Sequence, residues 1–210
     1  LSHVSLHAIC VDRNSGKILH NIPLLEVDKP QWVHKLNSYA SPTPVLDSGR
    51  LYCHFGAFGT ACLDTASARV TWRNQKHKVM HENGPGSSPV LHENHLILHM
   101  DGSDKQYVLA LDKHTGETAW QTTRSGRLNN HPQLKKAYGT PLLLEMNGKT
   151  TVVSTGADWL YGYDPSNGKE LWKIHYGILG FSNVSRPVAG NGMLFFSTCF
   201  MKANILAIKY

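Results

Sequence analysis

The sequence lacks the long apolar run that a membrane-spanning helix needs, because none of its hydrophobic stretches approaches roughly 18 residues. It is also poor in charge, with 17% charged against 41% hydrophobic residues, which excludes a disordered chain and a coiled coil. No secretion signal stands before Leu1, so we expect an export signal to lie outside these residues. The sequence therefore predicts a globular chain with no membrane span in these 210 residues.

Cysteine is scarce, and none of the four cysteines forms a C-x-x-C pair or another metal-ligand spacing. A structural zinc site is therefore not expected. The 21 Lys and Arg against 15 Asp and Glu leave a net charge of +6. Nucleic-acid binders gather their basic residues on one stripe, whereas the densest basic positions here are well separated along the chain. We therefore expect no nucleic-acid partner.

An internal repeat is the strongest positive signal in the sequence. The copies are AICVDRNSGKILH (8–20), ACLDTASARVTW (61–72), LALDKHTGETAW (109–120) and YGYDPSNGKELW (161–172), with a truncated copy ILAIKY (205–210). The aspartates of these copies, Asp12, Asp64, Asp112 and Asp164, are 52, 48 and 52 residues apart. A second marker, Thr/Ser/Arg-Pro-Val/Leu, alternates with them at 43–45, 88–90, 140–142 and 186–188. This period is typical of one four-stranded propeller blade.

Each copy has residues that suit a strand, a tight turn and a second strand. The aspartate at the strand end accepts backbone N–H groups of the turn, and Gly116 or Gly168 supplies a positive φ. A tryptophan then stands in the next strand, at Trp72, Trp120 and Trp172. Two copies depart from this pattern, because Ala68 replaces the glycine and His20 replaces the tryptophan. We predict a strained turn at 65–69 and weaker packing at His20.

Cysteine positions within the repeat predict how these residues pack. Cys10 and Cys62 stand where other copies have Ala110, Gly162 and Ala207, so they are expected to be small buried residues. Cys53 and Cys62 flank a short hairpin loop. Whether they are bridged stays open, since a disulfide directly across two paired strands is uncommon.

The turn signals predict an all-β fold, a β-propeller of four-stranded antiparallel blades. For one full unit we expect strands at 87–91, 95–100, 106–111 and 118–122. About four blades are expected within a single domain over 1–210. They comprise blade remnants at 1–30, blades at about 38–80, 84–125 and 136–176, and a partial blade at 183–210.

These units resemble the pyrroloquinoline-quinone-type propeller repeat, on the phrases Ser-Ser-Pro-Val (87–90), Leu-Ala-Leu-Asp (109–112) and Thr-Gly-Glu-Thr-Ala-Trp (115–120). That repeat occurs in quinoprotein alcohol dehydrogenases and in a non-enzymatic propeller lipoprotein of outer-membrane assembly. The chain also resembles secreted or envelope propellers of bacteria. The resemblance implies that the tryptophans dock between blades and that the protein is periplasmic, envelope-bound or secreted. It also implies seven or eight blades, so we expect an arc whose missing blades precede Leu1, the alternative being a small four-bladed ring whose two ends complement each other. An open arc would expose apolar sheet faces, so we expect it to self-associate or to be unstable alone.

Quinone chemistry is not expected, although the resemblance raises it. Family dehydrogenases hold their cofactor between a tryptophan floor and a disulfide of adjacent cysteines, with calcium and a catalytic aspartate. No adjacent cysteine pair exists here, and Asp101, Asp104 and Asp158 stand in different blades without a ligand-like run. His92, His95 and His99 are the densest histidines, and we interpret them as ordinary repeat positions. We therefore predict no cofactor and no metal, and identify no catalytic residue.

Topology indicates where a ligand binds. Loops that enter the innermost strand and loops that join the second and third strands share one end of a propeller, around the channel mouth. The candidate binding residues on these loops are His34, Tyr39, His54, His81, Glu82, Asp101, Asp158, Asn183 and Arg186. This mixture suits a protein, peptide or glycan better than a phosphate. We predict a non-enzymatic binding or scaffolding module, the alternative being a quinoprotein-like oxidoreductase or a hydrolase with its active site at the same face.

Overall fold

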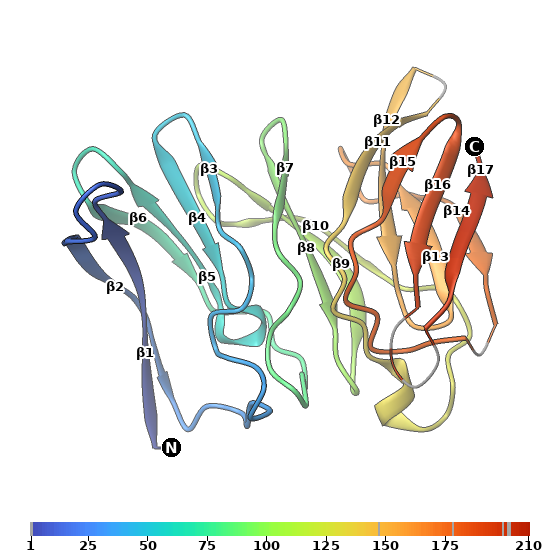
Figure 1. Cartoon of the computed structure of the whole chain (residues 1–210), viewed down its shortest axis with the longest axis horizontal. Coiled ribbons are helices and arrows are strands. Elements are labelled where there is room, and N and C mark those ends of the chain that lie inside the picture. The colour runs from blue at the N-terminus through green and yellow to red at the C-terminus, as the bar shows by residue number, and fades with distance from the viewer. Residues whose placement is uncertain (1, 147, 178, 199, 201–202) are drawn as a thin grey trace.

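The computed structural model describes residues 2–146, 148–177, 179–198, 200 and 203–210, and these form antiparallel sheets standing side by side in a row (Figure 1). The strands are β1 (His3–Val11) and β2 (Ile18–Asp28) in the first sheet; β3 (Val45–Asp47), β4 (Arg50–His54), β5 (Thr60–Asp64) and β6 (Arg69–Asn74) in the second; β7 (Val90–His92), β8 (His95–Asp101), β9 (Gln106–Asp112) and β10 (Thr118–Thr123) in the third; β11 (Leu142–Met146), β12 (Lys149–Thr155), β13 (Trp159–Tyr163) and β14 (Glu170–His175) in the fourth; and β15 (Val188–Gly190), β16 (Met193–Ser197) and β17 (Ile205–Lys209) in the fifth. Within each sheet the strands pair in chain order. The predicted all-β propeller fold is confirmed, and each sheet is a blade.

Among the residues that the structure describes, helix is confined to two short 3-10 turns, η1 (Gly56–Phe58) and η2 (Pro132–Lys135). In the part of the chain that the structure describes, no helix has the length and apolar character needed to cross a membrane. One predicted strand was wrong at its start, because 87–89 lie outside β7. Pro89 has no N–H to donate to a ladder, and the Ser88 N–H instead donates to Thr140 Oγ1 of the next blade at 3.0 Å.

The turn that recurs in the repeat copies is built by the aspartate of each copy. Oδ1 of Asp112 accepts the backbone N–H groups of His114 at 2.9 Å and Thr115 at 2.8 Å. Asp12 accepts the equivalent pair, from the N–H groups of Asn14 and Ser15. Asp64 accepts the Ser67 N–H and Asp164 accepts the Ser166 N–H. Hydrogen bonds from the turn serine hold the pKa of Asp64 below its usual value. These turns close the hairpins at the upper edge of the row in Figure 1.

Two tryptophans join neighbouring blades through the same contact. The indole N–H of Trp72 donates to Lys113 O at 3.0 Å, and that of Trp120 donates to Pro165 O at 3.1 Å. Each ring also lies on the turn glycine of the next blade, where a Cβ at Gly116 would come within 2.5 Å of Trp72. The glycine is therefore required both for its φ of +76° and for the space that the ring occupies.

Ala68 adopts the left-handed conformation that its glycine counterparts adopt, with φ +56°. An L residue with a Cβ is strained there by roughly 1–2 kcal/mol, and the extra chain entropy of glycine offsets part of the relief. We therefore expect Ala68→Gly to raise the free energy of unfolding by about 0.5–1 kcal/mol in urea titrations. Ala66→Gly, in the same turn without a positive φ, is the control and should be neutral or destabilising. Equal gains in both variants would contradict the strain.

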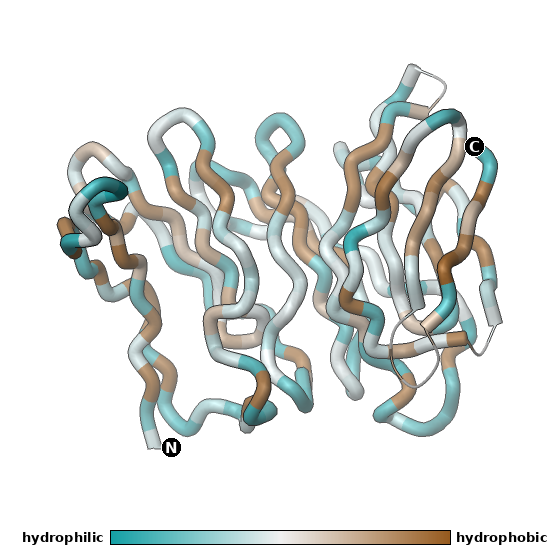
Figure 2. The backbone as a smooth tube through the Cα atoms, viewed as in Figure 1, coloured by the Kyte–Doolittle hydropathy of each residue, from teal (hydrophilic) through white to brown (hydrophobic). Residues whose placement is uncertain are grey.

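The core consists of apolar layers between successive blades, and Figure 2 shows the hydrophobic stretches along the strands with polar turns between them. Tyr52 and Trp72 of the second blade pack on Leu96, Leu98 and Leu109 of the third. Equivalent layers lie between the first and second, third and fourth, and fourth and fifth blades. Side chains of one blade thus complete the core of the next, so each blade depends on its neighbours.

The cysteine predictions have mixed outcomes. Cys62 is fully buried as expected, but the prediction for Cys10 was wrong, because Cys10 is exposed on β1, whose described sheet partner is β2. Cys53 and Cys62 are both free thiols. The strand register explains why they are not bridged, since Cys53 pairs with Ala61 and Cys62 pairs with Tyr52. The two cysteines therefore lie in the apolar layers on opposite faces of the sheet. The fourth cysteine, Cys199, lies outside the described residues.

Candidate binding face at the loop end of the blades

Long loops gather at the end of the blades opposite the aspartate turns, along the lower edge of Figure 1. They run from each fourth strand to the next first strand, with described residues at 29–44, 75–89, 124–141, 176–177 and 179–187, and between second and third strands, at 55–59, 102–105 and 156–158. We call this surface the loop face. It contains both 3-10 turns, η1 and η2. The structure thus brings the loops between blades and the loops between second and third strands to the same end of the blades, as the sequence predicted.

Hydrogen bonds from loop to loop make this surface one continuous layer. Tyr138 is the centre of the layer, because its hydroxyl donates to His81 O at 2.6 Å and its backbone N–H donates to Asn183 O at 2.7 Å. Asn37 donates through Nδ2 to Asn83 O at 2.8 Å. These bonds link loops of four successive blades, so the surface is held in one shape.

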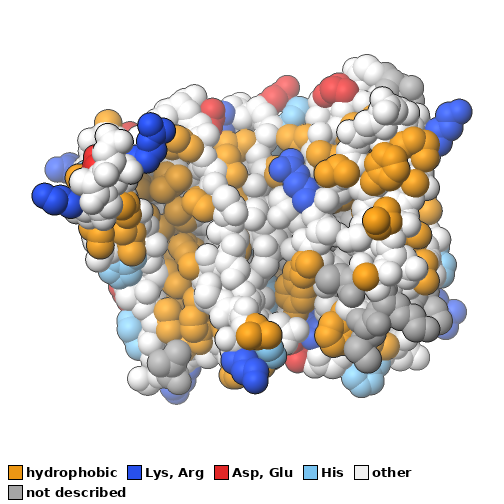
Figure 3. Space-filling model, in the orientation of Figure 1, with side chains coloured by type: hydrophobic (Ala, Val, Ile, Leu, Met, Phe, Trp, Pro, Cys, Tyr) orange, Lys and Arg blue, Asp and Glu red, His pale blue; other side chains and the backbone are white. Residues whose placement is uncertain are grey.

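A cavity of about 440 Å³ opens in this layer, a size within the range of ligand pockets. It is lined by His34, Leu36, Asn37, Asn83, Pro85, Gly86, Tyr138, Ser182, Val184 and Phe200. Three of the lining side chains are apolar yet largely exposed, Leu36 at 86%, Val184 at 59% and Phe200 at 54%. Figure 3 shows hydrophobic side chains gathered at this edge with basic side chains beside them. Apolar groups left in water on a rigid polar frame are typical of a recognition surface.

Four of the nine predicted binding residues are buried and hold the layer from beneath. His54 bonds to Thr60 Oγ1 through Nδ1 at 2.9 Å, and His81 accepts the Ala57 N–H at Nε2 at 2.6 Å. Asn183 donates to Gly156 O at 3.2 Å. The fourth is Asp101, described below. Because these side chains are at most 5% exposed, they position the loops and present no surface to a partner.

The Asp101 carboxylate forms a buried bidentate pair with Arg124. Nε and the Nη2 of Arg124 both donate to it at 2.6 Å, and both side chains are 1% exposed. Burial alone would lower the pKa of Arg124, but the facing carboxylate outweighs it and raises that pKa. The guanidinium also lies over the Tyr161 ring, 4.9 Å from its centroid. The pair ties the loop-face ends of β8 and β10 together, since Asp101 is the last residue of β8 and Arg124 directly follows β10.

Three histidines under the loop face are buried in the neutral state. Burial lowers the pKa of His54 to about 3 and that of His81 to about 4. Burial, with the Arg124 cation, holds the pKa of His99 well below its usual range. His99 Nδ1 lies 2.8 Å from Gly139 O, so its ring also supports a loop.

The remaining predicted residues lie nearer to solvent. His34 lines the cavity and stacks edge-on against Trp32, and Tyr39 is half-buried against Phe58. Glu82 accepts hydrogen bonds from Ser103 and Gln133. Asp158 is half-buried, and burial raises its pKa. Arg186 is fully on the surface, outside the cavity lining.

Sequence reasoning missed the apolar lining of the cavity. Leu36 stands between Lys35 and Asn37, and Val184 stands between Asn183 and Ser185, so each is an isolated apolar residue in a polar loop. An isolated apolar residue in a polar loop was the signal in the sequence that could have indicated this lining. Their convergence depends on contacts between loops about 150 residues apart, which no local pattern encodes.

The residues present do not fit a quinone with its calcium ion. Across the described ranges, no three His, Cys, Asp or Glu side chains are grouped so as to hold a metal ion. Asp101 is already bound to Arg124 through both carboxylate oxygens, and Asp158 lies on a different loop. Calcium needs several converging oxygen ligands. No chemical step through either group is therefore derived for this chain.

Comparison with known proteins places the geometry in context. The sequence model for the family described as outer membrane protein assembly factor BamB matches residues 7–200. No curated protein gives a significant match. Among solved structures, the chain is similar to BamB from Moraxella catarrhalis, with TM-score 0.55, 14% identity, and coverage of 100% of this chain and 60% of that one.

Two further structures share the fold. Quinohemoprotein alcohol dehydrogenase from Comamonas testosteroni matches with TM-score 0.56 and 15% identity over 80% of this chain and 30% of that one. The computationally designed Ika4 protein matches with TM-score 0.53 and 9% identity over 87% of this chain and 99% of that one. The chain thus spans 60% of the BamB chain and 30% of the dehydrogenase. At these identities the likeness concerns the fold alone.

Proposed function

The chain belongs to the family of outer membrane protein assembly factor BamB, and from that premise we propose that it is a non-enzymatic scaffolding propeller whose loop face binds a segment of a partner protein. The cavity among the loops of four blades is the observation that carries this proposal. Its frame is held by hydrogen bonds between loops and its exposed groups are apolar, which suits the side chains of an extended peptide. The family name also supports an envelope location, periplasmic or membrane-associated through other proteins.

The chemistry of the cavity favours a peptide over a glycan or a small substrate. Leu36 and Val184 offer apolar contact, while the amides of Asn37 and Asn83 and the hydroxyl of Ser182 offer hydrogen bonds to a peptide backbone. Its lining, as far as the structure describes it, contains no Asp, Glu, Lys or Arg side chain. An extended segment with apolar residues and without strong net charge therefore fits best.

Substitution of the exposed apolar groups tests this function. Leu36→Glu and Val184→Glu each place a charge where the partner segment packs, and neither side chain supports the fold because both are mostly in solvent. We expect each variant to bind the partner recovered from source-cell extracts at least 10-fold more weakly, measured by biolayer interferometry. Leu171→Glu, on β14 and 48% exposed, is the matched control and should bind as the unaltered chain does.

Two outcomes would contradict the proposal. Unchanged affinity in both loop variants would remove the cavity from the interface. Binding that survives protease treatment of the extract but is lost on glycosidase treatment would assign the loop face to a glycan.

A further inference from the structure

Trp32 is a large aromatic side chain exposed on the loop face. It lies in the loop 29–44 and is 63% exposed. The tryptophans of the repeat serve blade packing, since the indole N–H groups of Trp72 and Trp120 donate to the next blade. Trp32 stands outside the repeat copies, and its indole N–H bonds to no described residue. The blade architecture therefore does not account for this ring, and tryptophan is enriched at binding interfaces.

Hydrogen bonds hold the segment that carries this ring on both sides. Before the ring, Gln31 Nε2 donates to Val79 O at 2.8 Å. After the ring, the His34 N–H donates to Asn83 O at 3.3 Å. The side chain of His34 packs edge-on against the Trp32 ring, with centroids 5.7 Å apart and planes at 86°. The exposed indole thus has a fixed place on the loop face.

A groove of about 570 Å³ lies along this loop, beside the cavity of the loop face. Its walls include the rings of Trp32, His34 and Tyr39, with Lys35 and Asn37 beside them. We call it the aromatic groove. His34 and Asn37 also line the cavity, so the two hollows share a wall. An extended chain seated in the cavity can therefore continue into the aromatic groove.

The free polar groups of the aromatic groove are hydrogen-bond donors. The indole N–H of Trp32 and the ammonium group of Lys35 bond to no described residue. His34 Nδ1 accepts a backbone N–H at 3.2 Å, so the neutral ring carries its proton on Nε2, which has no partner among the described residues either. No Asp or Glu lines the groove within the described residues. A matching ligand therefore supplies acceptors.

These features indicate the chemistry of the ligand. A proline residue offers a carbonyl acceptor without an N–H donor, and proline-rich segments dock in aromatic-lined grooves. Consecutive prolines already hold the extended polyproline II form, so little conformational entropy is lost on binding. A glycan is a poorer match, because its hydroxyl groups need acceptors as well as donors. A carboxylate beside the prolines would complement Lys35.

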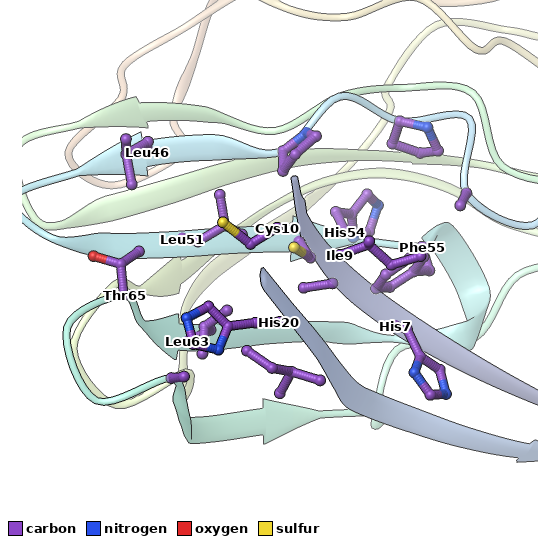
Figure 4. A pocket seen from close by; sticks show the side chains of 17 residues that line it. His7, Ile9, Cys10, His20, Leu46, Leu51, His54, Phe55, Leu63 and Thr65 are labelled. Atoms are coloured by element: carbon purple, nitrogen blue, oxygen red, sulfur yellow. The ribbon is translucent and has the colours of Figure 1, made fainter. Parts of the chain in front are cut away.

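The same loop also borders a second groove, which lacks this set of donors. Ala40, Pro42 and Pro44 line a hollow of about 420 Å³ between the first two blades (Figure 4). His20 lines it as well and is exposed, in agreement with the weaker packing predicted at that position. Among the described residues this lining includes no tryptophan and no lysine. The free indole and ammonium donors are therefore on the side of the loop that faces the cavity.

We propose that the aromatic groove binds a proline-containing stretch of the partner segment, with an acidic residue next to the prolines. This inference rests on the proposed function, because the aliphatic part of the same segment occupies the cavity. A proline ring packs in the corner between the perpendicular rings of Trp32 and His34. The indole N–H and the His34 Nε2–H donate to carbonyl groups of the stretch, and the Lys35 ammonium pairs with the carboxylate.

Synthetic peptides provide the probe, and the full chain is the target. The test peptide, acetyl-GLVSGEPPEG-amide, joins an aliphatic pair to two prolines flanked by glutamates. A second peptide has alanines in place of the prolines, and a third has glutamines in place of the glutamates. We expect the test peptide to bind at least 10-fold more tightly than the alanine peptide and at least 3-fold more tightly than the glutamine peptide, measured by isothermal titration calorimetry.

Variants of the groove locate the binding site. Trp32→Ala should bind the test peptide at least 10-fold more weakly. Lys35→Gln should remove the preference for the glutamate peptide over the glutamine peptide. The matched controls are Leu171→Ala, 48% exposed on β14, and Lys169→Gln, exposed in an aspartate turn, and both should bind as the unaltered chain does. Far-UV circular dichroism checks that each variant is folded.

The outcomes separate this inference from the proposed function. Partner binding that falls in Leu36→Glu but not in Trp32→Ala would overturn the inference and leave the cavity as the binding site. Equal affinities for the proline and alanine peptides, or no binding of any peptide at 1 mM, would overturn it too. Partner binding unchanged in both Leu36→Glu and Trp32→Ala would contradict the proposed function itself.

Discussion

Asp101→Asn is expected to lower the free energy of unfolding by about 3–5 kcal/mol, because it leaves the Arg124 guanidinium buried without its counter-charge. Both side chains are 1% exposed, and the carboxylate accepts two hydrogen bonds of 2.6 Å. Asparagine keeps the shape of the side chain, so the loss reports charge and not a cavity. The measurement is chemical denaturation followed by tryptophan fluorescence and far-UV circular dichroism.

An exposed ion pair provides the matched control for this prediction. Glu117 bonds to Lys76 at 2.9 Å with both side chains more than half in solvent. Glu117→Gln should change stability by less than about 1 kcal/mol. If Asp101→Asn lowers the free energy of unfolding by less than about 1 kcal/mol, the buried pair does not hold the ends of β8 and β10 together. The support that we assign to this pair beneath the loop face would then be wrong.

Acidification from pH 7 to pH 5 is expected to destabilise the fold by about 5 kcal/mol through His54, His81 and His99. Each is neutral and buried in the folded state, with pKa values of about 3 for His54 and about 4 for His81, and burial lowers that of His99 likewise. In the unfolded chain the histidine pKa is about 6.5. Below that value the unfolded state binds more protons than the folded state. Lowering the pH therefore reduces the free energy of unfolding by up to roughly 1.4 kcal/mol per pH unit for each histidine.

Removal of one titrating ring isolates the effect. His54→Asn keeps a polar atom near Nδ1 beside Thr60 but cannot titrate in this range. Urea unfolding across pH 5 to 7 should then show an average pH slope shallower by about 1 kcal/mol per unit. His131→Asn, an exposed position on the loop before η2, should leave the slope unchanged. A parent chain with equal stability at pH 5 and pH 7 would contradict neutral burial of these rings.

Local chemistry made much of the fold predictable. The aspartate turn with Gly116 and Trp120 is encoded within about a dozen residues, and its recurrence determines the blade period. The strain at Ala68 followed from the same pattern. The start of β7 was mispredicted because the residues before Pro89 bond to the next blade, which a reading of one blade omits.

The site was less predictable because its chemistry depends on partners far along the chain. Asp101 is a residue type that is usually exposed, and its buried partner Arg124 is brought to it by β9 and β10 from 23 residues along the chain. The burial of Cys10 was mispredicted for the converse reason, since among the described residues β1 pairs only with β2, whereas β5 pairs with both β4 and β6. Burial in a repeat fold depends on neighbouring strands and blades, so one position of the repeat has different environments in different blades.

Site-specific photo-crosslinking in source cells tests the central claim, that the loop face binds a partner protein, most directly. A benzophenone side chain would be placed at Leu36, at Val184 and, as a control, at Leu171 on β14. The account predicts one and the same protein crosslinked from both loop positions and absent from the control. Crosslinks to that protein from Leu171 with none from Leu36 or Val184 would contradict it.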